Sequence, residues 1–250
     1  MPRILAALTA SFAVALFAGC GASTGPVEGS RPEVESGPRT ASDHESLSPS
    51  PAPTTPRARS AEPASPAKNG GLASDGRPRR ARLSIPAIGV RALRVVPYAG
   101  SPDDAPGTRI QDGGVAASPH GRDGGVGPGG IGNYLVTAHR TSSTRAFADL
   151  PSLRRGDRVH VAAAGTRYTY RIEATRSTSF RSARSLARQS AAVPGHPGRR
   201  PTSAMITLST CATPEDHARG NYWADEFGNP EHRIDKIGVL VAARPRQDAG

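Results

Sequence analysis

Alternating apolar and polar residues recur along the chain from residue 82 onward and predict short β-strands. Residues 82–90 alternate in this way and include a proline, a combination typical of an edge strand. Residues 134–138, 204–208 and 237–241 are apolar runs rich in residues of high β-propensity. We therefore expect strands at these four places.

Two further alternating runs, residues 158–162 and 167–172, are separated by a short segment that contains Gly165, a pattern that predicts a β-hairpin. Helical patterns are few. We expect one short helix over residues 182–191 and a single helical turn over residues 146–150. Many short strands with one or two short helices favour a mainly β fold, a closed or nearly closed barrel.

Residues 99–132 form a tract rich in glycine, proline and aspartate, and we expect it to be a loop. The tract contains a GxGxxG pattern at Gly125, Gly127 and Gly130. A dinucleotide-binding loop leads into a helix, whereas this one leads into the strand expected at residues 134–138. The pattern is therefore interpreted as loop glycines.

The N-terminal residues indicate export. Arg3 precedes the apolar run 4–18, which is shorter than the roughly 20 residues of a membrane-spanning helix and matches the core of a signal peptide. The run closes as Phe17-Ala18-Gly19-Cys20, which resembles the lipobox of bacterial lipoproteins, although leucine is usual at the position of Phe17. We expect residues 1–20 to be a signal peptide with lipid attached at Cys20, or else an uncleaved membrane anchor. Both place the protein on the extracytoplasmic face of the membrane.

Residues 21–80 are rich in proline, serine and alanine and nearly free of large apolar side chains, which predicts a disordered spacer. One folded domain over residues 81–245 remains. The net charge of +11 comes almost wholly from arginine, but no nucleic-acid-binding motif accompanies it, so we expect no nucleic-acid partner. The histidines of the domain show no metal-ligand spacing, and we expect no metal and no cofactor.

Three residues at the ends of expected strands carry reactive groups. His139 follows the strand at 134–138, Cys211 ends the strand that begins at 204, and Arg233 opens the last strand. Singly, they fit a loop histidine, a packed thiol and a surface arginine. Together they supply a nucleophile, a proton shuttle and a fixed cation for an oxyanion, which is the minimal set for acyl transfer.

Several motifs occur in one order along the chain: the opening Leu-Ser-Ile-Pro-Ala-Ile-Gly-Val at 83–90, Ala-His-Arg-Thr at 138–141, Leu-Arg-Arg-Gly-Asp at 153–157, and Thr-Leu-Ser-Thr-Cys at 207–211. With these motifs the chain from about residue 82 to 243 resembles the sortases, the wall-anchoring transpeptidases of Gram-positive bacteria. It is most similar to the class E group of actinobacteria.

The resemblance implies an eight-stranded β-barrel and assigns roles to the three residues. Cys211 would attack the carbonyl between Thr and Gly of an LPxTG-like or LAxTG-like sorting signal and form a thioester. His139 would act as acid and base, Arg233 would bind the oxyanion or substrate, and Thr210 would help to hold substrate. An amine of a peptidoglycan precursor would accept the acyl group, which joins a surface protein to the wall.

Two departures from the family pattern leave alternatives open. The family arginine often lies about ten residues after the cysteine, so Arg219 competes with Arg233, which we prefer because a strand follows it. The intervening loop holds Tyr222, Trp223 and Phe227, although aromatic residues make up only 4% of the chain. These side chains either line a groove for substrate or acceptor or pack the loop onto the barrel.

Two other functions compete with transpeptidation. A cell-wall cysteine hydrolase would release the same thioester to water, but papain-like wall hydrolases place cysteine before histidine, the reverse of the order here. A non-catalytic lipoprotein could bind wall polymer through its arginines. The combination of His139, Cys211 and an arginine argues against this second alternative.

Overall fold

The computed structural model describes residues 72–246, and the predicted signal segment with Cys20 lies outside them, as does the spacer up to residue 71. Residues 72–80 contact the loop at 127–130. The amide of Ser74 donates to the carbonyl of Gly129 (2.8 Å), and that of Gly127 donates to the carbonyl of Gly76 (2.7 Å). The contacts of the folded part therefore begin before residue 81, where we placed the domain boundary. None of the helices in the described part has the length and apolar character needed to span a bilayer.

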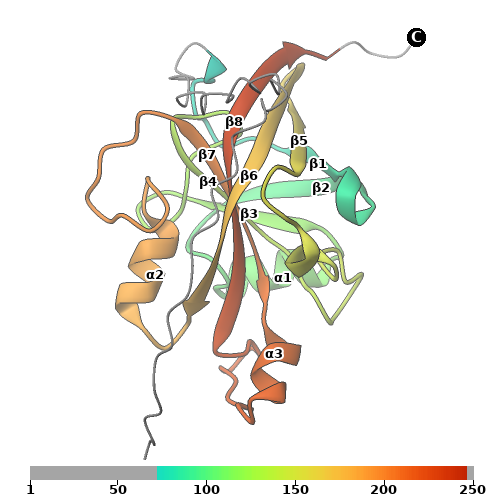
Figure 1. The fold of residues 1–250 in the computed structure, drawn as a ribbon, viewed down its shortest axis with the longest axis vertical. Coiled ribbons are helices and arrows are strands. Elements are labelled where there is room, and N and C mark those ends of the chain that lie inside the picture. The colour runs from blue at the N-terminus through green and yellow to red at the C-terminus, as the bar shows by residue number, and fades with distance from the viewer. Residues whose placement is uncertain (1–71, 247–250) are drawn as a thin grey trace, which may run out of the picture. The chain divides into compact units, whose positions relative to one another are not determined.

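Eight strands close into a barrel in the order β1-β2-β3-β4-β7-β8-β6-β5 (Figure 1). Pairing is antiparallel except between β2 and β3 and between β4 and β7, which run parallel. The strands are β1 (Ala81–Ile85), β2 (Val90–Ala99), β3 (Ala116–His120), β4 (Gly132–Thr137), β5 (Arg158–Ala163), β6 (Thr166–Ser179), β7 (Ala204–Cys211) and β8 (His232–Pro245). The expected mainly β, eight-stranded barrel is confirmed.

Three short helices accompany the barrel in residues 72–246, and α2 alone among them was predicted: α1 (Ala105–Asp112), α2 (Ala183–Ser190) and α3 (Thr213–Ala218). In Figure 1, α2 lies to one side of the barrel and α3 lies at the end where β7 stops. Two single turns of 3₁₀-helix, η2 (Pro86–Ile88) and η3 (Leu150–Ser152), complete the described elements. The helical turn expected at 146–150 is a run of turns that leads into η3.

The barrel interior is filled by alternate residues of the strands. Leu83 and Ile85 of β1 and Ile206 and Leu208 of β7 are fully buried in one apolar cluster. Because side chains of a strand alternate between its faces, the residues between them point outward. Burial of each apolar side chain of this size stabilises the folded state by about 1.5–3 kcal/mol. The apolar runs seen in the sequence therefore define the inner face of the barrel.

The hairpin of β5 and β6 is confirmed, with Ala163 paired to Thr166 across its turn. Ala164 and Gly165 both have positive φ (47° and 73°), the conformation of a tight two-residue hairpin turn. Glycine adopts this conformation without strain, which explains why the turn is visible in the sequence. The helix expected at 182–191 is also present, as α2.

The prediction of one edge strand over residues 82–90 is wrong in two respects. β1 ends just before Pro86, and a 3₁₀ turn at Pro86–Ile88 separates β1 from β2. β1 is also not at an edge, because it pairs with β2 on one side and with β5 on the other. A closed barrel leaves no edge, so proline here marks a corner between strands.

The expected loop at 99–132 contains both α1 and β3. Asp104 caps α1 by accepting a hydrogen bond from the amide of Gly107 (2.8 Å). Gly107 is required in the helix because an added Cβ would collide with the Tyr98 hydroxyl. Gly107 lowers the helix propensity of α1, whereas Pro106 lies in the first turn, where proline is tolerated, so tertiary packing offsets the effect of the glycine.

Candidate active site

Strand pairing brings Cys211 and Arg233 together. β7 and β8 are antiparallel, and Cys211, the last residue of β7, is the direct partner of Arg233, the second residue of β8. Arg219, the competing arginine, follows α3 and is exposed to solvent. Of the two arginines, the structure thus places Arg233 beside the thiol.

His139 reaches the same place from a third strand. β4 runs parallel to β7, with Thr137 opposite Ser209. The Thr210 hydroxyl donates to the carbonyl of Ala138, the residue before His139 (2.8 Å). Arg140, the residue after His139, donates to the carbonyl of Cys211 (3.4 Å). The ends of β4, β7 and β8 therefore meet around the thiol. The Thr210 side chain contacts the backbone before His139, and its expected part in holding substrate stays a prediction.

The guanidinium of Arg233 is buried, with only 1% of the residue exposed. Its Nε donates to Asp103 Oδ2 (2.7 Å), its Nη1 donates to the carbonyl of Pro230 (2.6 Å), and its plane lies over the ring of Phe180. Its Nη2 is buried and has no partner within the described residues. A buried donor without an acceptor costs about 1–3 kcal/mol, so a group that accepts from Nη2 would be favoured there.

Two aspartates of the segment around α1 bind the two residues beside the thiol, Arg233 and His139, and neither aspartate was found from the sequence. Asp103 precedes the helix, is buried with φ of 61°, and bonds both Arg233 and the Gln111 side chain. Asp112 ends the helix, and its Oδ1 lies 2.9 Å from Nε2 of His139. No sequence signal identifies them, because their tract has the composition of a loop.

A family model described as a sortase domain matches residues 83–224, more than half of the chain. The chain belongs to the sortase family. Members of this family are cysteine transpeptidases, which agrees with a thiol, an imidazole and a guanidinium at three adjacent strand ends.

Solved sortases share the fold of this one. The SrtA sortase of Actinomyces oris matches with a TM-score of 0.51 at 18% identity, covering 70% of this chain and 87% of that one. Sortase E1 of Streptomyces coelicolor, solved with a tripeptide in its active site, matches with a TM-score of 0.50 at 20% identity, covering 70% and 94%. At these identities the likeness is one of fold. No curated protein sequence matches this chain.

The surroundings of the sortase thiol shift its pKa in opposite directions. Burial raises the pKa of Cys211 to about 11, Arg233 acts against this increase, and Asp103 and Asp225 add to it. Burial is the largest effect on Arg233 and disfavours its charged form, but Asp103, Cys211 and Asp225 together raise the pKa of the guanidinium. At neutral pH the site therefore holds a protonated thiol beside a permanent cation.

The loop between α3 and β8 forms one wall of the sortase site. Asp216 is buried in α3 and accepts from the amide of His232 (3.0 Å), which ties the helix to the start of β8. Trp223 packs against Arg181, whereas Tyr222 and Phe227 are 71% and 46% exposed. Trp223 therefore contacts the segment that joins β6 to α2, and the other two aromatic rings are exposed to solvent.

The described part of the sortase contains no group of three or more His, Cys, Asp and Glu side chains arranged to hold a metal ion.

Proposed function

We propose that this sortase cleaves an LPxTG-like or LAxTG-like sorting signal between Thr and Gly and joins the surface protein to a cell-wall amine. The single observation that carries the proposal is the pairing of Cys211 with Arg233, whose Nη2 is buried and unpartnered. The remaining steps follow from the chemistry of the groups around that pair.

In the first half of the reaction, Sγ of Cys211 attacks the threonine carbonyl carbon. Since burial keeps the thiol protonated at neutral pH, a base has to remove its proton as the C–S bond forms. We assign the base to His139, which follows β4, the strand paired with β7; its Nε2 is bonded to Asp112, so Nδ1 is the nitrogen that would take the proton. The same proton then passes to the glycine nitrogen as the C–N bond breaks, and a thioester remains on Cys211.

Negative charge develops on the threonine oxygen when the thiolate attacks. The open Nη2 of Arg233 is a fixed donor in a site that excludes water, where such a donor stabilises the oxyanion far more than solvent does. Asp103 and the Pro230 carbonyl hold the other two nitrogens, so the guanidinium does not need to reorganise.

In the second half, the amine of a peptidoglycan precursor attacks the thioester carbonyl. His139 takes the proton from the amine, the C–S bond breaks, and Cys211 leaves and regains its proton. The product is a new amide between the surface protein and the wall. We further propose that the enzyme works on the extracytoplasmic face of the membrane, held by lipid on Cys20 or by an uncleaved anchor, a placement that the N-terminal sequence supports.

The test uses the full-length protein, an LPxTG and an LAxTG peptide, and a glycine amide as acceptor, with products separated by mass. We expect a peptide–glycine-amide product whose yield rises with amine concentration and which Cys211→Ala abolishes. Cleaved acid alone, at every amine concentration, would identify a wall hydrolase and contradict transpeptidation.

A further inference from the structure

Four arginines lie in one row across five neighbouring strands of the barrel. Arg94 of β2 is directly opposite Arg82 of β1, and Arg82 is opposite Ala162 of β5. Ala162 is opposite Arg167 of β6, which in turn is opposite Arg244 of β8. Residues directly opposite each other on paired strands share a face of the sheet. All four arginines are exposed, so this arginine row lies on the outer face of the barrel.

The arginine row has no carboxylate partner in the described part of the chain. β1, β2 and β5 contain no aspartate or glutamate, and none of the ion pairs within residues 72–246 includes a member of the row. Burial and the positive charges of Arg167 and Arg158 lower the pKa of His160, which lies beside the row on β5. Like charges directly opposite each other destabilise a sheet, so a bound anion would relieve repulsion here.

Three cavities follow the arginine row. The first, of about 330 Å³, lies beside the arginines of β1 and β2, the second, of about 210 Å³, between those of β1 and β6, and the third, of about 480 Å³, beside those of β6 and β8. Ala162 lines the first two, where its small side chain leaves room, and Arg246, which follows β8, lines all three. The cavities are therefore neighbours and form one groove that is lined by arginines.

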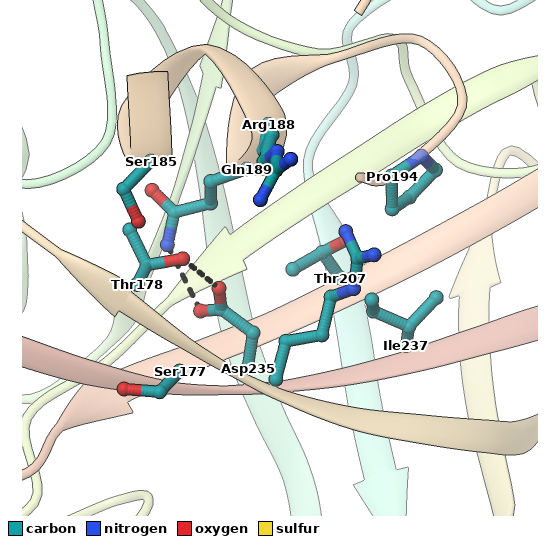
Figure 2. A pocket seen from close by; sticks show the side chains of 10 residues that line it. Ser177, Thr178, Ser185, Arg188, Gln189, Pro194, Thr207, Asp235 and Ile237 are labelled. Carbon is teal, nitrogen blue, oxygen red and sulfur yellow. Dashed lines mark hydrogen bonds between the residues drawn. The ribbon is translucent and has the colours of Figure 1, made fainter. Parts of the chain in front are cut away.

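The cavity between β6, α2, β7 and β8 is also lined by arginines, but it differs from this groove (Figure 2). Arg176 and Arg188 line it together with the carboxylate of Asp235. That carboxylate accepts hydrogen bonds from the Thr178 hydroxyl (2.6 Å) and the Gln189 amide (2.9 Å), as the dashed lines in Figure 2 mark. A carboxylate repels anions, so of the two places the groove along the arginine row favours a polyanion.

The shape of the arginine row favours a chain-like anion over a flat surface. Neighbouring strands lie about 4.8 Å apart, so the row extends over about 19 Å. Because it crosses five of the eight strands of a closed barrel, it follows the curve of the barrel. A bilayer is flat on this scale and could contact only part of the row, whereas a flexible polymer could follow it. Phosphate is the matching anion, since a guanidinium binds it through two parallel hydrogen bonds.

We propose that the arginine row binds a linear phosphodiester polymer and so tethers the domain, an activity that goes beyond the proposed transpeptidation and does not depend on it. Arg233, the partner of Cys211, is the second residue of β8, and Arg244 is the last but one. They are therefore roughly 35 Å apart along the strand. Figure 1 shows β8 running from the end of the barrel near α3 to the opposite end. A polymer bound at the row thus leaves the thiol accessible.

The test measures binding of fluorescently labelled poly(glycerol phosphate) to the full-length protein by fluorescence anisotropy. We expect the double variant Arg82→Gln/Arg167→Gln to bind about tenfold more weakly, because two charge-assisted contacts to phosphate are lost. Ala162→Glu, which places a carboxylate between these two arginines, is expected to weaken binding at least as much. All three substitutions lie on the outer face of the barrel, so thermal unfolding is expected to stay nearly unchanged.

Arg184→Gln/Arg199→Gln is the matched control, because it removes the same charge at two exposed positions that do not line the groove. It is expected to bind within about twofold of the unmodified protein. Equal weakening by the two double variants would show that the net charge of +11 attracts the polymer, and would overturn the proposal.

A second arm replaces the polymer with vesicles of phosphatidylglycerol and phosphatidylcholine. The apolar N-terminal run is common to all variants, so only the differences between variants report on the arginine row. We expect Arg82→Gln/Arg167→Gln and the control to bind these vesicles alike. If Arg82→Gln/Arg167→Gln weakens vesicle binding and leaves polymer binding unchanged, the partner is an anionic membrane and the proposal is wrong.

Discussion

The three guanidinium nitrogens of Arg233 differ in their hydrogen-bond partners. Nε donates to Asp103 and Nη1 donates to the Pro230 carbonyl, whereas Nη2 is buried and has no partner within the described residues. A planar fork held at two points presents its third nitrogen in one direction, which a flexible ammonium group cannot reproduce. We therefore assign binding of the oxyanion to Nη2 of Arg233.

Replacement of Arg233 by lysine keeps the charge and removes the fork. We expect Arg233→Lys to lower kcat/KM for peptide cleavage by about 10²–10³, the usual loss when an oxyanion donor is removed. Arg219→Lys serves as the control and is expected to stay within about twofold, since Arg219 is exposed and away from the thiol. A larger loss in Arg219→Lys than in Arg233→Lys would reverse the assignment.

The raised pKa of Cys211 predicts how the thiol responds to pH. Because the folded protein holds the thiol protonated up to about pH 11, the thiolate fraction keeps increasing through the neutral and mildly alkaline range. The rate of alkylation of Cys211 by iodoacetamide is expected to rise about tenfold per pH unit from pH 7 to 10, since only the thiolate reacts. A rate that levels off below pH 9 would show that the thiol ionises much more readily than its burial implies.

Asp103 is a positioning residue, because it acts on the reaction through Arg233. Asp103→Asn keeps the shape of the side chain and removes its charge, so we expect kcat to fall by about tenfold with little change in KM. Asp103→Glu is expected to recover part of the loss. The neighbouring Asp104→Asn is the control, because asparagine also caps a helix well, and it is expected to leave kcat unchanged.

At the scale of elements, the sequence identifies those parts whose local signals agree with their final structure. The β5–β6 hairpin was predictable because its turn residues favour the conformation that they adopt. α1 was not predictable, because Gly107 lowers its helix propensity and the helix lies in a tract rich in turn-forming residues, while Gly107 packs closely against Tyr98.

The candidate site, like the elements, was only partly predictable from the sequence. Cys211, His139 and Arg233 could be placed at strand ends because the apolar runs beside them are clear. The last strand was predicted to open at Arg233, with its apolar part at residues 237–241, and β8 begins one residue earlier, at His232. Asp103 and Asp112 could not be found at all, since only the position of α1 in space connects them with the thiol.

Lys236 joins β8 to η3. Its Nζ donates to the carbonyls of Pro151 and Leu153 (2.8 and 2.6 Å), and burial lowers its pKa. Lys236→Met leaves both carbonyls without a donor, and we expect the free energy of unfolding in urea to fall by about 2 kcal/mol. Arg244→Met, at an exposed position of the same strand, is the control and is expected to change it by less than about 0.5 kcal/mol. Equal effects of the two substitutions would contradict the role of Lys236.

At the scale of the whole molecule, the described domain is a closed barrel whose inner face provides stability and whose outer face provides chemistry. The parallel pairing of β4 with β7 and the antiparallel pairing of β7 with β8 bring three distant parts of the sequence to one rim.

The measurement that tests the central claim most directly is intact-mass and peptide mapping of the full-length protein after brief incubation with a sorting-signal peptide. We predict an added mass equal to the peptide up to its threonine, located on Cys211, released by hydroxylamine and absent from Cys211→Ala protein. Cleavage of the peptide by Cys211→Ala protein, or an acyl adduct on any other residue, would contradict the account.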